Sequence, residues 1–560
     1  MKKLFCTAAL TLLLACMLRV PSQALDHDML KVGLRFGTDA LFSANLWNYN
    51  DEPAGSGYTL GYYDSDRSFV SLAETDEEKI SVTADGNIYV ASGLYYEAMP
   101  SAGASVIGGY HLQLAEPFET AEEAALAAAQ YENAFLAFLS DGVYVRIGSY
   151  ADMTAAVAAV EAWGGDAAVE LVQPSSTGVT VTKYATTTIL FEFDYGGLRS
   201  LGVLPRSIDG ERTRVWFKNR VYFGGFEYQR VTGGSINVIN VVNIEDYVKC
   251  VITGEMSADW PLEALKAQSV CARTYAAQQQ RHRSSGFDVC TTDDCQVYYG
   301  SSACTTDSDR AVDETAGKYL YYNGELVANA VYYSYNGGAS EDCKNVWYSD
   351  VPYLKGKADP YEADIAAVMS GYYWSVSFTA DELTAILETK LSPENQIGRV
   401  TNVYVSQFTG TGNVLALTFE GTRGSYTVRK EACRTIFNGV ISGKSVRSMR
   451  FTIGEGDAQQ VYVNPAQDTL RSISGAYVIS GSGEVSQHTG SSSTTYVLTA
   501  NGLSPLREEE SAAKSGLFTI SGSGHGHNVG MSQWGAYAMA ERGYDYVDIL
   551  TFYYTGVAVE

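Results

Sequence analysis

Two glutamates near the middle of the sequence have different local settings. Both lie in VITGEMSADWPLEALKAQSVCARTY, residues 251–275. Glu263 falls in the first turn of an expected helix, three residues before Lys266, where an acid suits the helix dipole, so we interpret it as structural. Glu255 is expected in a loop ahead of that helix, between a glycine and a methionine. An apolar loop would raise the pKa of Glu255 and suit it to general acid catalysis, although a solvated loop glutamate is the competing interpretation.

The helix that follows Glu255 is predicted from residue types. Pro261 suits a first helical turn, Asp259 is expected to cap the helix, and good helix formers extend from Leu262 to about Gln280. One narrow face of mostly small side chains is formed by Ala264, Ala267, Cys271 and Tyr275. Such a face allows the helix to pack closely against another element.

A glycine-rich loop near the end of the sequence carries two histidines. His525 and His527 lie in GSGHGHNVG, residues 522–530, and are two of only six histidines in the chain. A single histidine is usually structural, but two at this spacing before an expected helix indicate polar groups at a cleft.

The elements that must position these residues are mainly short strands. The sequence contains 40 Tyr and 54 Gly, and runs of aromatic and β-branched residues end at Gly, Asn or Asp turns. A chain of 560 residues that is 46% hydrophobic and 18% charged is folded and long enough for two or three domains. The formal net charge of -25 argues against a nucleic-acid partner and fits an exported protein.

The N-terminus has the pattern of an export signal. Lys2 and Lys3 precede an apolar run over residues 4–18, and small residues lead to a predicted signal-peptide end at residue 24. A retained membrane anchor is less favoured because the run is short, and a lipoprotein signal ending at Cys16 ranks third. We therefore expect a secreted protein, in which removal of the signal leaves seven cysteines.

Residues 106–176 differ in sequence pattern from the strand-rich segments around them. Their predicted order is strand, helix, strand, strand, helix, strand, with a capping box from Thr120 to Glu123, a hairpin turn at Asp141 and a helix cap at Asp152. This is the order of the split ferredoxin-like fold. Together with DGVYVRIGSYADMTAAVAAVEAW, it resembles the SPOR domain, which binds peptidoglycan glycan strands that lack stem peptides. An α+β insertion without a ligand is the alternative.

Two long motifs resemble the SpoIID/LytB family of stage II sporulation protein D and the amidase enhancers. They are VVNIEDYVKCVITGEMSADWPLEALKAQSVCARTYA and, at residues 522–556, GSGHGHNVGMSQWGAYAMAERGYDYVDILTFYYTG. DVCTTDDCQVYYG, YYSYNGGASED and VPYLKGKADPYE lie between them in the family's order. The likeness spans residues 181–560, and strands in residues 25–105 are expected to belong to the same core. The resemblance implies an α+β fold: a strand-rich SpoIID-type catalytic core, with a few helices lining a substrate cleft, and a small ferredoxin-like (βαββαβ) SPOR-like insertion.

The resemblance assigns catalysis to Glu255. In a lytic transglycosylase one acid protonates the glycosidic oxygen and then takes the proton of the sugar's own C6 hydroxyl, so neither water nor a second carboxylate is needed. His527 matches the family histidine, whereas His525 replaces a usual aromatic residue and Asn528 a usual glycine. The residues indicated for substrate binding are His527, His525, Ser532, Gln533, Tyr335, Asn336 and Arg273.

Four more residues suggest a metal site. Some sporulation members of the family hold zinc here with two Cys and two His. This sequence has Cys290 and Cys295, with Asp294 at a family histidine position and His282 displaced from the usual one. Zinc would be structural, and no cofactor is required for catalysis. A Cys290–Cys295 disulfide and two free thiols are the alternatives.

The sequence therefore leads to a secreted peptidoglycan lytic transglycosylase that acts on denuded glycan strands at the cell wall or the sporulation septum. The alternative is a non-catalytic amidase enhancer, which binds the wall and activates a separate peptidoglycan amidase. A hydrolase that releases reducing ends is less favoured, because we find no second carboxylate at a recognisable spacing.

Overall fold

The computed structural model describes residues 28–49, 56–100, 103–207, 213–231, 233–279, 281–347, 349–454 and 516–560, and the backbone of short strands between 461 and 505. The predicted signal peptide, with its anchor and lipoprotein alternatives, lies outside these residues. Within them, no helix has both the length and the apolar character that a membrane crossing requires.

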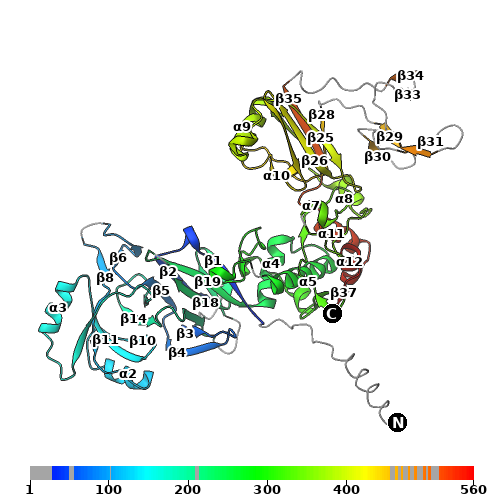
Figure 1. The fold of residues 1–560 in the computed structure, drawn as a ribbon. Coiled ribbons are helices and arrows are strands. Elements are labelled where there is room, and N and C mark those ends of the chain that lie inside the picture. The colour runs from blue at the N-terminus through cyan, green and yellow to red at the C-terminus, as the bar shows by residue number, and fades with distance from the viewer. Residues whose placement is uncertain are drawn as a thin grey trace, which may run out of the picture. The chain divides into compact units, whose positions relative to one another are not determined.

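The chain divides into two compact units, which are described separately. Unit 1 comprises the residues up to Ala330 together with Ala558–Glu560, and unit 2 comprises Val331–Val557. Both units are built from several sheets with helices packed beside them (Figure 1). The strand-rich α+β class expected from the sequence is therefore confirmed.

Unit 1 contains a seven-stranded sheet around one apolar strand. This strand, β19, has the sequence INVINVVN and is buried at every position except the last, as expected for a strand covered on both faces. It pairs antiparallel with β1 on one side and β18 on the other. The strands, in order across the sheet, are β20 (Val289–Cys290), β1 (Met29–Arg35), β19 (Ile236–Asn243), β18 (Gly225–Arg230), β15 (Leu201–Pro205), β3 (Tyr58–Tyr63) and β4 (Phe69–Thr75).

A second sheet of unit 1 has ten strands. In order they are β12 (Val169–Val172), β9 (Tyr110–Leu114), β11 (Gly142–Tyr150), β10 (Ala134–Leu139), β14 (Ile189–Asp194), β13 (Val179–Lys183), β5 (Lys79–Ala84), β2 (Ser43–Tyr49), β16 (Arg214–Phe217) and β17 (Arg220–Phe223). The first four strands alternate with α2 (Ala121–Ala128) and α3 (Met153–Glu161) in the predicted βαββαβ order. They do not form a separate sheet, because β10 pairs in parallel with β14.

A buried ion cluster shows that this sheet is strongly curved. Arg146 on β11 and His111 on β9 lie 2.6 and 3.1 Å from the carboxylate of Glu192 on β14. Two strands separate β9 from β14, which in a flat sheet would place them about 14 Å apart. Burial acts to raise the pKa of Glu192, but His111 and Arg146 outweigh it and lower the pKa to about 2. The cluster therefore ties the βαββαβ segment to the strands beside it.

Helices α4 (Ile244–Glu255), α5 (Leu262–Gln278) and α6 (Thr306–Asp313) pack against one another, and α4 also packs against β19 and β1 of the seven-stranded sheet. Figure 1 shows α4 and α5 beside this sheet. The predicted helix from Leu262 is α5, although its N-cap is Pro261 rather than Asp259. Helix α4 was missed, because its run of β-branched residues was interpreted as a continued strand. Asn243 starts it: the side chain accepts the backbone N–H of Glu245, which satisfies a first-turn donor.

Unit 1 also contains smaller elements. They are β6 (Ile88–Ala91), β7 (Leu94–Tyr96), β8 (Ser105–Ile107), β21 (Leu320–Tyr322), β22 (Glu325–Leu326) and β37 (Ala558–Val559). β21 pairs with both β22 and β37.

Unit 2 has two three-stranded sheets that share an apolar core with α9. The core contains Phe378, Leu383, Phe419, Phe437 and Ile520, all fully or almost fully buried. The sheets are β24 (Tyr373–Thr379), β35 (Leu517–Ser523) and β28 (Phe451–Gly454), and β25 (Val400–Phe408), β26 (Val414–Gly421) and β27 (Gly424–Arg429). The helices are α7 (Cys343–Val346), α8 (Glu362–Val368), α9 (Ala380–Lys390), α10 (Ala432–Thr435), α11 (Gln533–Glu541) and α12 (Tyr546–Tyr553).

The histidine loop of unit 2 runs from the end of β35 to a short parallel pair of strands, β23 (Tyr332–Tyr333) and β36 (Met531–Ser532). Three backbone hairpins complete the unit: β29 (Val461–Val463) with β30 (Asp468–Leu470), β31 (Tyr477–Ile479) with β32 (Val485–Gln487), and β33 (Tyr496–Thr499) with β34 (Gly502–Pro505).

Candidate functional site

Glu255 is the last residue of α4 and does not lie in a loop, so the setting expected from the sequence was wrong. Its side chain is half-buried, and its Oε1 accepts the backbone N–H of Val297 at 2.9 Å. The carboxylate is therefore oriented by a rigid helix on one side and by a backbone donor on the other.

The position of Val297 is set by its two neighbours. Tyr247 of α4 donates its hydroxyl to Oε1 of Gln296 at 3.1 Å, and Tyr298 donates its hydroxyl to Oδ1 of Asn240 on β19 at 2.7 Å. Gln296 and Tyr298 are almost completely buried. Their anchoring holds the segment between them against the end of α4.

Gly254 allows α4 to lie this close to the Val297 segment. A Cβ atom at this position would lie 2.9 Å from the carbonyl oxygen of Val297 and 3.1 Å from its Cγ1. A backbone contact below 3.0 Å forces one of the two segments to move. The glycine before Glu255 therefore has a packing role that the sequence analysis did not identify.

Arg273 of α5 locks the other end of α4. Its guanidinium is completely buried and donates from Nε at 2.9 Å and from Nη2 at 2.6 Å to the carboxylate of Glu245, in the first turn of α4. Nη1 donates to the carbonyl oxygen of Lys318 at 3.1 Å. Arg273 was predicted to bind substrate, but in this structure it has no exposed surface and joins two helices. Glu263 forms an ion pair of 2.8 Å with Lys266 three residues on, as its structural interpretation requires.

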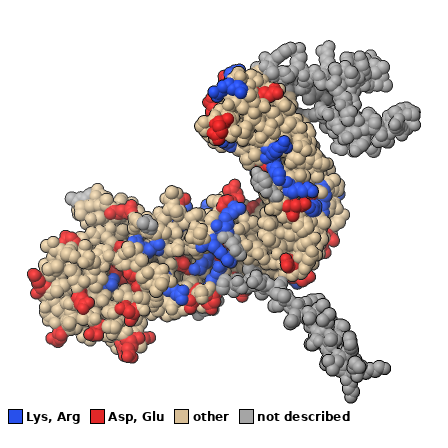
Figure 2. Space-filling model, viewed as in Figure 1, with Lys and Arg blue, Asp and Glu red and all other residues tan. Residues whose placement is uncertain are grey.

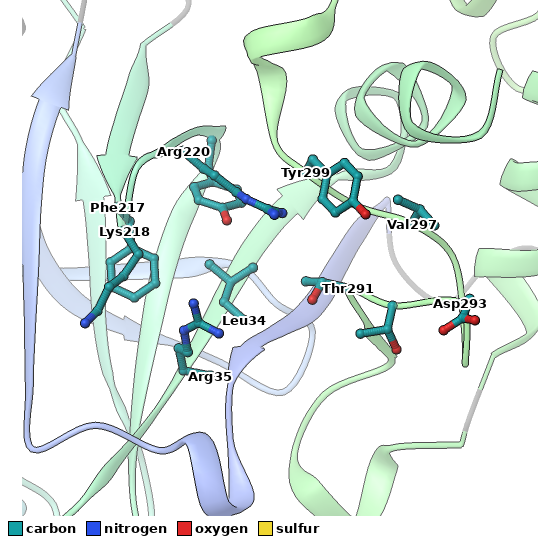
Figure 3. Close-up of a pocket in the computed structure, with 11 residues that line it drawn as sticks. Leu34, Arg35, Phe217, Lys218, Arg220, Thr291, Asp293, Val297 and Tyr299 are labelled. Carbon is teal, nitrogen blue, oxygen red and sulfur yellow. The ribbon is translucent and has the colours of Figure 1, made fainter. Parts of the chain in front are cut away.

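A pocket of about 490 Å³ lies beside Val297 (Figure 3). Arg35, from the end of β1, and Arg220, from the start of β17, both point toward its space (Figure 3). Burial raises the pKa of Tyr222, which also lines the pocket, whereas Arg220 and Arg35 act to lower it. The remaining lining residues are Leu34, Phe217, Lys218, Thr291, Thr292, Asp293, Val297 and Tyr299. Sequence reasoning missed this pocket because its residues come from three separate segments.

The four residues predicted as metal ligands are brought together in unit 1. One ligand atom from each of His282, Cys290, Asp294 and Cys295 lies within 4.8 Å of the others. Nε2 of His282 is buried without a hydrogen-bond partner and lies 3.5 Å from Oδ2 of Asp294. The structure contains Cys290 and Cys295 as thiols. Two sulfurs, an imidazole nitrogen and a carboxylate oxygen form a donor set that suits zinc.

One short segment, residues 290–299, connects these features. It supplies three of the four clustered residues, the N–H that binds Glu255, and five residues of the pocket lining. The conformation of this segment therefore controls the surroundings of Glu255.

In unit 2, His527 is held by its neighbours. Its Nδ1 accepts the backbone N–H of Val529 at 3.1 Å, and its ring lies 5.4 Å from that of Tyr333 and 5.0 Å from that of Trp347. Burial lowers the pKa of His527 to about 4, so the ring is neutral at neutral pH. Asn528, at the family glycine position, has φ +63°, a left-handed conformation that asparagine tolerates better than most residues.

Glu362, at the start of α8, forms hydrogen bonds with some of the predicted binding residues. Its carboxylate accepts the backbone N–H groups of Asn336 at 2.7 Å and Gly337 at 2.9 Å, and the hydroxyls of Ser532 and Tyr372. Burial, and then nearby Asp359, raise the pKa of Glu362 to about 7. Sequence reasoning missed Glu362, although its spacing from Asp359 at a helix start was a usable signal.

The other predicted binding residues surround this network. The backbones of Tyr335 and His525 exchange hydrogen bonds of 3.3 and 2.7 Å, and the side chain of Asn336 donates to Asp359 at 2.7 Å. Asn336, Tyr335, Ser532 and Gln533 are buried, whereas His525 is exposed. The structure thus brings six of the seven predicted binding residues together in unit 2, and their contact with sugar remains a prediction.

Residues 232–322 match the family described as stage II sporulation protein, SpoIID. This range contains Glu255, Val297 and all four clustered residues of unit 1.

Three relatives extend the match. An amidase enhancer of Bacillus subtilis (strain 168) is 32% identical over 312 residues, 56% of this chain and 40% of that protein. An uncharacterised protein of Brachyspira hyodysenteriae (strain ATCC 49526 / WA1) is 30% identical over 337 residues, 58% of this chain and 68% of that protein. Stage II sporulation protein D of Bacillus subtilis (strain 168) is 25% identical over 379 residues, 63% of this chain and 86% of that protein. The chain thus spans less than half the length of the amidase enhancer.

Proposed function

The chain belongs to the SpoIID family, and from this premise we propose that it is a secreted peptidoglycan lytic transglycosylase. It cuts denuded glycan strands to 1,6-anhydro-muramyl products, in remodelling of septal peptidoglycan during sporulation. The observation that carries the proposal is the position of Glu255, at a helix end, bonded to Val297 beside a polar pocket.

The surroundings of Glu255 suit a group that both donates and accepts a proton. The negative end of the α4 dipole disfavours an ionised carboxylate at the last helical residue, whereas the N–H of Val297 stabilises one. In its protonated form Glu255 can give its proton to the glycosidic oxygen. It can then, as a carboxylate, accept the proton of the C6 hydroxyl as the anhydro ring closes.

Digestion of peptide-free glycan strands, with mass spectrometry of the products, tests the proposal. The unchanged chain is expected to release anhydro ends, and Glu255→Gln is expected to release none. Glu263→Gln is the matched control, because Glu263 pairs with Lys266 within α5. Equal turnover by Glu255→Gln and the unchanged chain would refute the assignment of Glu255.

An amidase enhancer is the second candidate, and the name of one relative favours it. In that case the chain would bind glycan and release no product, while increasing the rate of an added peptidoglycan amidase. The same digestion, run with and without an amidase, separates the two functions.

A hydrolase is the third candidate, because the pocket contains a carboxylate that sequence reasoning did not consider. Asp293 lines the pocket opposite Lys218 (Figure 3). A hydrolase would need such a second carboxylate and would release reducing ends. We expect Asp293→Asn to retain turnover and anhydro products. Loss of turnover in this variant, with reducing ends from the unchanged chain, would favour hydrolysis.

We also propose a structural zinc ion held by Cys290, Cys295, Asp294 and His282. Nε2 of His282, which is buried and has no hydrogen-bond partner, and the closeness of two thiols support this assignment. When bound, zinc would cross-link the 290–299 segment to His282, and it would take no part in proton transfer.

For the βαββαβ segment we propose glycan binding, as in SPOR domains. Two observations support this: the segment has the βαββαβ order of elements, and its four strands are neighbours in the sheet in the order β12, β9, β11 and β10. Hydrogen exchange of the whole Glu255→Gln chain with peptide-free glycan tests it. Protection within residues 106–176 is expected, and unchanged exchange there would exclude binding.

A further inference from the structure

The pocket beside Val297 is lined by three cations, Arg35, Lys218 and Arg220, and by one carboxylate, Asp293. Among the described residues none of these three cations forms an ion pair, so the lining carries an excess of positive charge. Arg220 lies 3.4 Å from the carbonyl oxygen of Tyr298, and its guanidinium lies 4.2 Å from the ring centre of Tyr299. Most arginines described elsewhere in unit 1 instead pair with acids, as Arg67 does with Asp288 at 2.6 Å.

This arrangement runs against the overall charge of the chain, which is -25. Figure 2 shows Lys and Arg gathered over the part of unit 1 near β1 and β19, whereas Asp and Glu are spread over the βαββαβ part. Unpaired guanidinium groups at a concave site are costly to keep together, because they repel one another. They are expected where an anionic ligand completes the site.

The donors in the pocket suit a carboxylate attached to a sugar. Two guanidinium groups offer planar, paired N–H donors that match a carboxylate. The hydroxyls of Tyr222 and Thr291 also line the pocket and can bond to neutral sugar oxygens. Tyr299 is 51% exposed and adds an aromatic surface at the rim on which a sugar ring can pack.

We propose that Arg35 and Arg220 form a subsite for the free lactyl carboxylate of a muramic acid residue. This inference rests on the proposed function, since it assumes that Glu255 acts on a peptidoglycan glycan strand. Each muramic acid carries a lactyl group, which is a carboxylate when the stem peptide is absent and an uncharged amide when the peptide is attached. Recognition of this charge would make the pocket select stripped strands over strands that carry peptides.

Binding by Glu255→Gln, which is not expected to cut the strand, tests the subsite. The probes are peptide-free glycan and the same glycan after its carboxylates have been converted to primary amides. We expect the charged strand to bind at least tenfold more tightly. Arg35→Gln and Arg220→Gln, each in the Glu255→Gln background, should weaken binding of the charged strand about tenfold and leave binding of the amidated strand unchanged. Arg310→Gln is the control, because Arg310 is exposed on α6 and pairs with Glu314.

The outcomes separate the subsite from the proposed function. Equal binding of the two strands, or equal weakening of both by the arginine variants, would overturn the subsite even if the unchanged chain cuts glycan. Selective binding of the charged strand without any cleavage would support the subsite and overturn the transglycosylase. Arg35→Gln keeps the test valid if Arg220→Gln fails to fold, because the side chain of Arg35 forms no hydrogen bond with any described residue and its backbone pairing in β1 does not depend on the guanidinium.

Discussion

The carboxylate of Glu255 and the backbone N–H of Val297, 42 residues apart in sequence, form a hydrogen bond of 2.9 Å. This bond joins the end of α4 to the 290–299 segment, which also contributes to the cysteine cluster and to the pocket. A change at the end of α4, in the cysteine cluster or in the pocket is therefore expected to alter the position of the Glu255 carboxylate. The predictions for unit 1 follow from this connection.

Gly254→Ala is expected to reduce turnover without unfolding the chain. Alanine normally stabilises a helix by about 0.5–1 kcal/mol relative to glycine, but here its Cβ would lie 2.9 Å from the carbonyl oxygen of Val297. The end of α4 must shift, and a small misplacement of a catalytic group can cost about 100-fold in rate. Turnover of peptide-free glycan and circular dichroism measure the two effects. Gly164→Ala is the control, because a Cβ there meets nothing within 4 Å.

Removal of the metal is expected to loosen the 290–299 segment. The purified chain should contain about one zinc per molecule, and a chelator should remove it, with faster hydrogen exchange at residues 290–299 and lower turnover. Cys295→Ser should lower the zinc content in the same way. Cys433→Ser should not, because Cys433 is buried in the core of unit 2. The prediction would be contradicted if the purified chain contained no zinc and a chelator left its hydrogen exchange at residues 290–299 unchanged.

Arg273→Met is expected to destabilise unit 1 by about 3 kcal/mol. The substitution leaves the carboxylate of Glu245, 26% exposed in the structure, without its buried partner. Urea unfolding measures the loss, and the double variant Arg273→Met/Glu245→Gln should recover part of it because no unpaired charge remains. Lost glycan binding with unchanged stability would instead support the substrate-binding role predicted from the sequence.

Local signals in the sequence were sufficient for elements with clear caps. The helix predicted from Leu262 is observed to Gln278, and Thr120 and Asp152 cap the helices that they were expected to cap. Helix α4 was missed because the run Val248–Ile252 is rich in β-branched residues, whose strand preference is overruled here by burial against α5 and α6. Asn243 and the acids after it were the available signals for its start.

The candidate site could be predicted only in part. The four clustered residues lie near one another in sequence, and the structure brings them together. The partner of Glu255 could not be found, because a backbone N–H carries no residue signature. Arg35 and Arg220 come from strands of different sheets, so their shared pocket depends on how the strands are arranged. Arg273 was assigned to substrate because a motif does not show which side of a helix is buried.

In unit 2, two groups make opposite contributions to the pH dependence of stability. Glu362 has a pKa of about 7 in the fold, above its usual value of 4.5, so the folded state holds a proton that the unfolded chain releases. Its contribution therefore falls as pH rises from about 4.5 to 7. His527 has a pKa of about 4, below its usual value of 6.5, so the unfolded chain binds the extra proton. Its contribution rises as pH increases from about 4 to 6.5, and the two largely cancel between pH 4.5 and 6.5.

Glu362→Gln is expected to expose the contribution of His527. The free energy of unfolding of this variant, measured by urea at pH 4.5 and 6.5 and compared with that of the unchanged chain, should rise with pH by up to about 3 kcal/mol. The free energy of unfolding of His527→Asn should instead fall as pH rises, because only the contribution of Glu362 remains in that variant. The slope in Glu362→Gln, which reports His527, is expected to be the smaller of the two, because His527 is partly exposed and solvent weakens its effect. Glu388→Gln, at an exposed position of α9, is the matched control and should keep the slope of the unchanged chain. Parallel slopes in Glu362→Gln and Glu388→Gln would show that Glu362 does not carry this proton in the folded state.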